Sequence, residues 1–224
     1  MDRPIPLPWY RQLVLRIATL WPLKALGTSA FMALFFWAYF SVMENPVGLP
    51  LIMPRLPLDQ AIPFSTLAFP AYVSLWVYVS LPTALMSGFR SLLLLGLWSA
   101  ALCLFCLALF WGFPTTVPPV DIDWHLYPEM ALIKGIDAAG NACPSLHVAS
   151  AVFSAVWLER VLVNVAAPVW LRCLSGVQCL VIMWSTVATR QHVVLDVIAG
   201  ALVGLVFGWA SLRQIESALG RQGI

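Results

Sequence analysis

Six stretches of almost uninterrupted apolar residues divide the chain, and polar residues are concentrated in the segments between them. An α-helix needs about 20 apolar residues to cross the hydrocarbon core of a bilayer, and most of these stretches reach that length. They cover residues 25–43, 64–86, 92–113, 144–158, 173–188 and 193–212. The fourth is short, so we expect its first turn to begin in a protein-lined recess. The pattern predicts an all-α, polytopic membrane helical bundle of about six transmembrane helices, folded as a single domain.

The composition agrees with a membrane protein. Hydrophobic residues make up 61% of the 224 residues and charged residues only 10%, whereas soluble domains carry about 25% charged residues. The net charge of +2 is too small to indicate a nucleic-acid partner. Residues 1–24 mix arginine with leucine, isoleucine and tryptophan, which predicts a cytoplasmic or interfacial N-terminal segment. No cleavable signal peptide is expected, because this segment has no short apolar core followed by small residues.

The placement of lysine and arginine predicts the orientation of the bundle. Cytoplasmic loops carry an excess of these residues. With the N-terminus in the cytoplasm, only Arg55, Lys134 and Arg190 of the twelve basic residues fall outside. We therefore predict an integral membrane protein, most simply of a bacterial inner membrane. In this orientation the outer ends of the fourth and sixth helices lie on the extracytoplasmic side.

The first of two short motifs, Pro144-Ser145-Leu146-His147, lies at the outer start of the fourth stretch. Proline is favoured in the first turn of a helix, where its missing N–H has no partner to lose. The N-terminus of a helix binds anions such as phosphate. His147 in this turn is therefore a candidate to donate a proton to a phosphate ester oxygen.

The second motif contains His192 and Asp196 at the start of the sixth stretch. Residues four apart share one face of a helix. An aspartate can fix the tautomer of such a histidine and leave its other nitrogen free to attack phosphorus. Arg190 beside them suits a phosphate ligand. Two alternatives are a purely structural His–Asp pair and a metal site that includes His147. The acidic residues of the outer loops do not have the spacing of metal ligands, so no metal is expected. His125 and Cys143 are read as an ordinary loop residue and a packing residue.

At these residues the chain resembles the type-2 phosphatidic acid phosphatase superfamily. That family's pattern has a Lys/Arg-Pro motif, then Pro-Ser-Gly-His, and then Ser-Arg, five residues, His, three residues and Asp. Here Ser185, His192 and Asp196 have the family's spacing. Leu146 replaces the glycine, Thr186 replaces the arginine, and no first motif is visible.

The departures resemble one branch of the superfamily, which includes inositol phosphorylceramide synthases. Pro-Ser-Leu-His and a Ser-Thr start to the third motif recur there, and residues 59–64 and 137–141 also look like that branch. The resemblance implies a metal-independent reaction without a cofactor, in which His192 forms a phosphohistidine, Asp196 orients it and His147 protonates the leaving alkoxide. It makes the following residues candidates for holding the phosphate: Ser145, Arg190, Lys134 and Asn141.

Three functions stay open. The first is a membrane-embedded lipid phosphate phosphatase acting at the extracytoplasmic face. The second is a lipid phosphotransferase that moves a phospho-headgroup to an alcohol acceptor. The third is a non-catalytic lipid transporter, because prolines interrupt the second stretch, as in some transporters. The expected partners are a lipid phosphate substrate and the bilayer.

Overall fold

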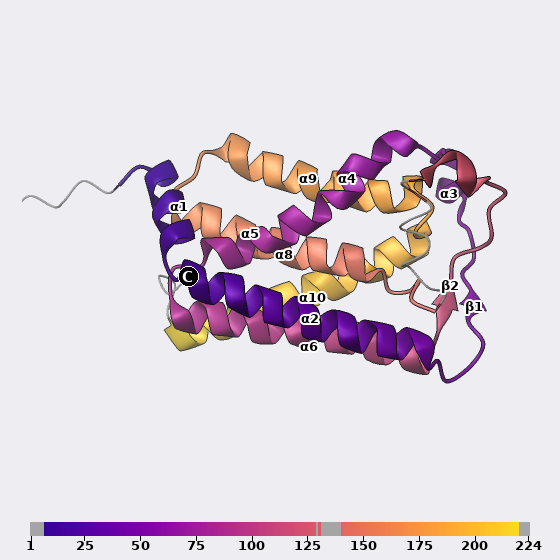
Figure 1. Cartoon of the computed structure of the whole chain (residues 1–224). Helices are drawn as coiled ribbons and strands as arrows, with labels where there is room; N and C mark the ends of the chain where they lie inside the picture. The colour runs from indigo at the N-terminus through magenta and orange to yellow at the C-terminus, as the bar shows by residue number, and fades with distance from the viewer. Residues whose placement is uncertain (1–6, 129, 131–139, 220–224) are drawn as a thin grey trace, which may run out of the picture.

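The computed structural model describes residues 7–128, 130 and 140–219. Its long helices run side by side in one bundle (Figure 1). Six helical segments are long and apolar enough to cross a membrane. They are α2 (Trp21–Glu44), the segment of η1, α4 and α5 (Thr66–Leu85), α6 (Phe89–Gly112), α8 (Leu146–Asn164), α9 (Val169–Ala188) and α10 (Val194–Leu219). The predicted all-α membrane bundle is confirmed.

The two ends of the bundle differ. One end carries α1 (Trp9–Ala18), and we call it the α1 end (Figure 1). The other, the strand end, carries β1 (Leu51–Ile52), α3 (Pro57–Ala61) and β2 (Thr115–Thr116) (Figure 1). The short helix η2 (Trp124–Leu126) follows β2 in the chain. β1 and β2 pair in parallel, with Leu51 opposite Thr115, so they join the loops that follow α2 and α6.

The second spanning segment is built from pieces. It consists of η1 (Thr66–Ala68), α4 (Phe69–Val73) and α5 (Leu75–Leu85), with a break at Ser74. The Ser74 hydroxyl donates to the carbonyl of Ala71 and accepts from the Gln178 side chain of α9 at 2.7 Å. These contacts satisfy polar groups at the break, which is how an interrupted helix is tolerated in a membrane.

The helix α8 is the centre of the bundle. Within its most apolar window, 56% of the residues are buried, against 6% for α2. Trp157 and Val161 of α8 are fully buried, and the Trp157 indole donates to the Ser211 hydroxyl of α10 at 3.0 Å. α8 is therefore held by its neighbours along its whole length.

Three glycines of α10 allow it to lie directly against α8. They are spaced four residues apart, at Gly200, Gly204 and Gly208, and so face one side of the helix. A Cβ at Gly200 would lie 2.4 Å from the carbonyl oxygen of Ser145, and one at Gly204 would lie 2.5 Å from that of Ala149. Larger residues would push apart the two helices whose starts carry the histidine motifs.

The ends of α8 differ from those expected. Pro144 is expected in the first turn, but it precedes the helix, because Ser145 is the N-cap and its hydroxyl accepts from Val148 N–H at 3.3 Å. The helix also continues to Asn164, beyond the expected end at residue 158.

Ion pairs of its charged residues explain why α8 continues to Asn164. The Arg160 side chain forms an ion pair with Glu216 of α10 at 2.6 Å, and Glu159 pairs with Arg172 of α9. Because each charge has a partner on a neighbouring helix, the helix accommodates both residues within its last turns.

Replacement of Gly204 by alanine tests the contact between α8 and α10. The added methyl group has a backbone atom as its nearest neighbour, so we expect Gly204→Ala to destabilise the protein by about 1–3 kcal/mol. Gly176→Ala is the matched control, because a Cβ at Gly176 of α9 meets nothing within 4 Å. Thermal unfolding in detergent measures both; equal melting temperatures for the two variants would contradict the close packing.

Candidate active site

His192 lies in the tight turn that joins α9 to α10. The N–H groups of Gln191 and His192 both donate to the carbonyl oxygen of Thr186, at 3.0 and 3.1 Å. Arg190 has a φ of 58° in this turn, a left-handed conformation that a large residue adopts only where its surroundings hold it. The spacing of His192 and Asp196 predicts that they share one face of a helix. In the structure His192 instead precedes α10, and the turn brings the two side chains together.

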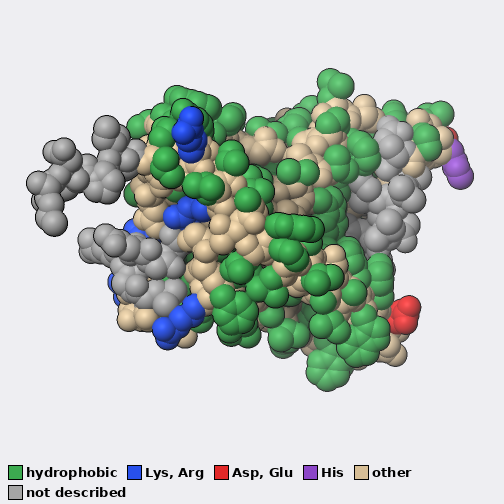
Figure 2. All heavy atoms as spheres, turned by 60° about the vertical axis from the view of Figure 1, so that its left-hand side comes forward, with side chains coloured by type: hydrophobic (Ala, Val, Ile, Leu, Met, Phe, Trp, Pro, Cys, Tyr) green, Lys and Arg blue, Asp and Glu red, His purple; other side chains and the backbone are tan. Residues whose placement is uncertain are grey.

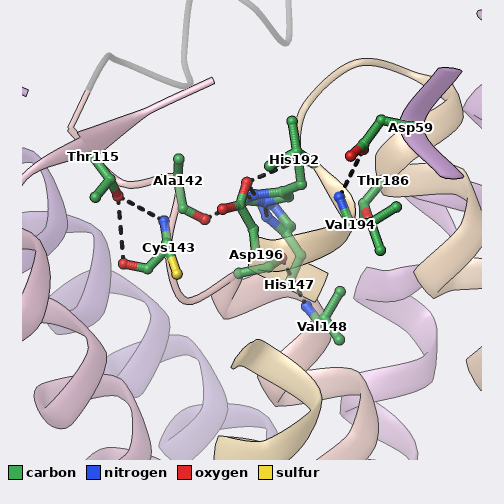
Figure 3. A network of polar contacts seen from close by, with 12 residues as sticks. Asp59, Thr115, Ala142, Cys143, His147, Val148, Thr186, His192, Val194 and Asp196 are labelled. Atoms are coloured by element: carbon green, nitrogen blue, oxygen red, sulfur yellow. Dashed lines mark hydrogen bonds and ion pairs between the residues drawn. The ribbon is translucent and has the colours of Figure 1, made fainter. Parts of the chain in front are cut away.

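The contacts of His192 determine which of its nitrogens carries the proton. Its Nδ1 lies 3.0 Å from the carbonyl oxygen of Ala142 and 3.6 Å from Oδ2 of Asp196 (Figure 3). Both neighbours are acceptors, so Nδ1 is the donor and Nε2 of the neutral ring has a free lone pair. Asp196 is fully buried; its Oδ2 also accepts from Val193 N–H at 2.9 Å, and its Oδ1 has no hydrogen-bond partner among the described residues.

The free nitrogen of His192 faces the second histidine. His192 Nε2 and His147 Nδ1 are 3.3 Å apart, and His147 Nε2 lies 2.9 Å from the hydroxyl of Tyr72. One proton arrangement satisfies all three groups: Tyr72 O–H donates to His147, and His147 Nδ1–H donates to His192. Tyr72 comes from α4 and is buried. A tyrosine inside an apolar run carries no signal of its own, so the sequence did not predict it.

A short segment before α8 holds the Ala142 carbonyl in place against His192. This segment pairs with β2: Thr115 N–H donates to Gly140 O at 3.2 Å, and Ala142 N–H donates to Thr115 O at 3.0 Å. The Thr115 hydroxyl accepts from Cys143 N–H at 2.8 Å (Figure 3). Burial, and then the nearby Asp196 carboxylate, raises the pKa of the Cys143 thiol to about 11. The thiol is therefore protonated near neutral pH, which suits the packing role expected of it.

Ser145 joins the two motifs through its backbone. Its N–H donates to the carbonyl oxygen of Asp196 at 3.0 Å, while its hydroxyl oxygen caps α8 at Val148. The residue is completely buried. Its hydroxyl proton is still available for an acceptor such as a phosphate oxygen.

Arg190 is tied to α3 and to Ile62, the residue that follows it. Its guanidinium donates to the carbonyl oxygens of Asp59 and Ile62, at 3.2 and 3.0 Å. The Asp59 carboxylate in turn accepts from Val194 N–H at 2.8 Å (Figure 3). It also accepts from Leu56 N–H at 2.7 Å. Asp59, which is buried, therefore fixes both the start of α10 and the start of α3, the helix that Arg190 contacts.

Backbone N–H groups at the start of α10 are already hydrogen-bonded within the protein. A helix N-terminus can bind phosphate through its free N–H groups, but here carboxylates of the protein already accept from Val193 and Val194 N–H. These two carboxylates, from Asp196 and Asp59, already interact favourably with the positive end of the helix. Any further anion at this site would therefore depend mainly on side-chain donors.

Of the remaining candidates, the structure describes Asn141 and His125. The Asn141 amide donates to the hydroxyl of Tyr39 on α2. Lys134 lies outside the described residues. His125 is exposed in η2, as expected of a loop residue. Among the described residues no group of three or more His, Cys, Asp or Glu side chains could hold a metal ion.

The fold and the site define a polytopic membrane protein with two histidines and a buried aspartate at one end of the bundle. A family model described as the PAP2 superfamily matches residues 91–218, which is more than half of the chain. The chain therefore belongs to the PAP2 superfamily, whose members are generally phosphatases and phosphotransferases. No curated protein and no solved structure matches it. The match includes both histidine motifs, but Asp59 and Tyr72 lie before it.

Tyr72→Phe tests whether the Tyr72 hydroxyl positions His147. Loss of one hydrogen bond of about 0.5–1.5 kcal/mol should lower kcat roughly two- to tenfold with little change in KM. Tyr78→Phe is the control, because Tyr78 is equally buried and its hydroxyl donates to the Ser175 carbonyl, away from the histidines. Steady-state kinetics on a lipid phosphate measures both. An equal loss in the two variants would assign Tyr72 a merely structural role.

Proposed function

We propose that this protein is a lipid phosphate phosphatase that passes the phosphoryl group first to His192 and then to water. The observation that carries the proposal is the pair of facing nitrogens, His192 Nε2 and His147 Nδ1. One has the free lone pair that a nucleophile needs, and the other is placed to handle a proton. Both are backed by fixed partners, Asp196 for His192 and Tyr72 for His147.

In the first step the His192 Nε2 lone pair forms a bond to phosphorus, and the bond from phosphorus to the lipid oxygen breaks. For this step His147 carries a second proton, on Nε2, which donates to the Tyr72 oxygen in place of the resting arrangement, and its Nδ1 proton goes to the leaving oxygen. The His192 ring gains positive charge as the N–P bond forms. The buried Asp196 carboxylate favours that charge, because the interaction is strong where water is excluded.

In the second step water attacks the phosphohistidine. His147, now neutral, accepts a proton from this water, and the N–P bond breaks to release phosphate. Reacting atoms approach to about 3–3.5 Å before a bond forms, so a phosphoryl group does not fit between nitrogens that are 3.3 Å apart. We infer that the two rings separate when substrate binds, and that their direct contact belongs to the resting enzyme.

The phosphate oxygens need donors. Ser145 offers a hydroxyl proton next to both motifs, and Arg190 lies two residues before the nucleophile. Arg190 would exchange its bonds to the carbonyls of Asp59 and Ile62 for bonds to phosphate. Lys134 and Asn141 are further candidates. The reaction in this form uses only groups of the chain and needs no metal or cofactor.

We place the site on the extracytoplasmic side of the membrane. In Figure 2 lysine and arginine side chains gather toward the α1 end, while a histidine and an acidic residue are visible at the opposite end. The described basic residues at or near the ends of helices there are Arg11, Arg16, Lys24, Arg90, Arg160, Arg172 and Arg213. Since basic residues favour the cytoplasmic side, the histidines face outward, in a bacterium toward the periplasm.

The second candidate is transfer of the phospho-group to an alcohol in place of water. Leu146 and Thr186 at the two variant positions favour it, because both resemble the branch that contains inositol phosphorylceramide synthases. The same phosphohistidine would serve both reactions, and only the final acceptor differs.

A lipid phosphate with a labelled phosphoryl group tests both reactions. The purified wild type and His125→Ala should release the label as free phosphate, while His192→Ala should lose roughly a thousandfold or more of this rate, because the nucleophile is gone. Inositol and diacylglycerol, added separately, supply the alternative acceptors, and the products are separated by chromatography. Label in a new phospholipid or polyol phosphate would favour the transferase; near-native activity of folded His192→Ala would contradict the mechanism.

A further inference from the structure

A groove lies along α8 at the α1 end of the bundle, between α9 and α10 (Figure 1). Its volume is about 530 Å³, and the second half of α8, the first half of α9 and the second half of α10 line it. Arg160, one of its charged residues, follows His147 by thirteen positions on α8, or about 20 Å along the helix axis. The groove is therefore separate from the histidine site.

Charged and apolar residues occupy different parts of this groove. Its charged residues are Glu159, Arg160 and Arg172, so its lining carries one more positive than negative charge. The other residues that line it are valine, alanine, leucine and glycine, apart from Ser175. A groove with a cationic end and apolar walls matches an amphipathic ligand with an anionic head. Basic pockets between membrane helices are known to bind the headgroups of anionic lipids.

Arg160 has a donor that the described residues do not use. Its Nη2 lies 2.6 Å from a carboxylate oxygen of Glu216, but its Nε is buried and has no hydrogen-bond partner among the described residues. Asn164 lies four residues later, on the same face of α8, and its buried Nδ2 also has no partner in the described part of the chain. Nearly all buried polar groups in proteins are hydrogen-bonded. These two donors therefore indicate an acceptor from outside the described residues.

The length of the groove is close to the thickness of one leaflet of a bilayer. From Arg160 back to Val152, α8 advances eight residues, or about 12 Å at 1.5 Å per residue. One leaflet of the hydrocarbon core is about 15 Å thick. Val163 and Leu205, which line the groove, are 44% and 51% exposed, so the groove is open on the side that faces hydrocarbon in a membrane. One acyl chain can therefore enter from the bilayer and fill the groove without passing the midplane.

We propose that this groove binds one anionic phospholipid from the leaflet at the α1 end. The phosphodiester accepts hydrogen bonds from Arg160 Nε and Asn164 Nδ2, and Arg172 adds positive charge beside it. One acyl chain lies along α8 toward Val152. The lipid contacts α8, α9 and α10 together, and a ligand that binds only the folded bundle raises its stability. The site uses no residue of the proposed phosphatase reaction, so the two proposals are tested separately.

Two variants weaken the site in different ways. Arg160→Gln removes the positive charge and the Nε donor. Gly176→Phe fills the groove from α9 and leaves every charge in place, because a Cβ at Gly176 meets nothing within 4 Å. The matched controls are Arg213→Gln and Gly112→Phe. Arg213 is exposed in α10, and its guanidinium lies over the Trp209 ring, outside the groove. Gly112, the last residue of α6, is equally open and does not line the groove.

The experiment measures binding of dioleoyl phosphatidylglycerol to the purified proteins by native mass spectrometry. Dioleoyl phosphatidylcholine, whose headgroup has no net charge, is the competing lipid. We expect the wild type and both controls to retain one phosphatidylglycerol molecule against this competition. Arg160→Gln and Gly176→Phe should each lower the affinity for it by at least about tenfold, which is the loss expected from one hydrogen bond to a charged group. Phosphatidylglycerol should also raise the melting temperature of the wild type and the controls, but not of these two variants.

The melting temperatures without phosphatidylglycerol show whether each variant is folded, and Gly176→Phe decides the test if Arg160→Gln is not. Equal retention of phosphatidylglycerol by Gly176→Phe and Gly112→Phe would overturn the site. An equal loss in Arg160→Gln and Arg213→Gln would also overturn it, because it would mean a general attraction of anionic lipid to the basic end of the bundle. The same holds if the wild type retains phosphatidylcholine as firmly as phosphatidylglycerol. No step measures phosphatase activity, so failure of the proposed function leaves this result unchanged.

Discussion

The buried carboxylate of Asp196 is the constraint on which the site depends. A charged group inside a membrane bundle is costly unless other groups compensate it, and such groups are usually functional. Its Oδ2 accepts from Val193 N–H and lies 3.6 Å from His192 Nδ1. Its backbone carbonyl accepts from Ser145 N–H, at the start of α8. One residue thus connects the turn that carries His192 to the helix that carries His147.

The close approach of α8 and α10 is needed for these contacts. Gly200 lies against the Ser145 carbonyl, with no space for a side chain between them. A larger residue there would move Ser145 away from Asp196. It would also move the first turn of α8, and with it His147. The packing of two membrane helices therefore sets the geometry of two imidazole rings.

The sequence predicts what depends on local pattern, and this covers most of the fold. Apolar stretches locate six spanning segments, and the spacing of His192 and Asp196 predicts that their side chains lie together, as they do. The Tyr72 hydroxyl and the Ala142 carbonyl could not be predicted, because each reaches its histidine only through tertiary packing. Pro144 was misplaced because the serine beside it is the better N-cap.

The donors at the start of α10 show a second limit of sequence reasoning. A helix N-terminus with free N–H groups is a sound expectation for a phosphate site. Here Asp59, far away in the chain, accepts from Val194 N–H at 2.8 Å. Long-range carboxylates of this kind have no local signature. In the proposed function, recognition of the phosphate is therefore assigned to side chains such as Ser145 and Arg190.

The most direct test of the central claim is the identity of the phosphorylated residue. Rapid mixing of the enzyme with a ³²P-labelled lipid phosphate, followed by an alkaline quench and peptide mass spectrometry, should find an acid-labile phosphoryl group on His192. His192→Ala should carry no label. Label on His147, or release of phosphate at the full rate without any labelled protein, would contradict His192 as the nucleophile.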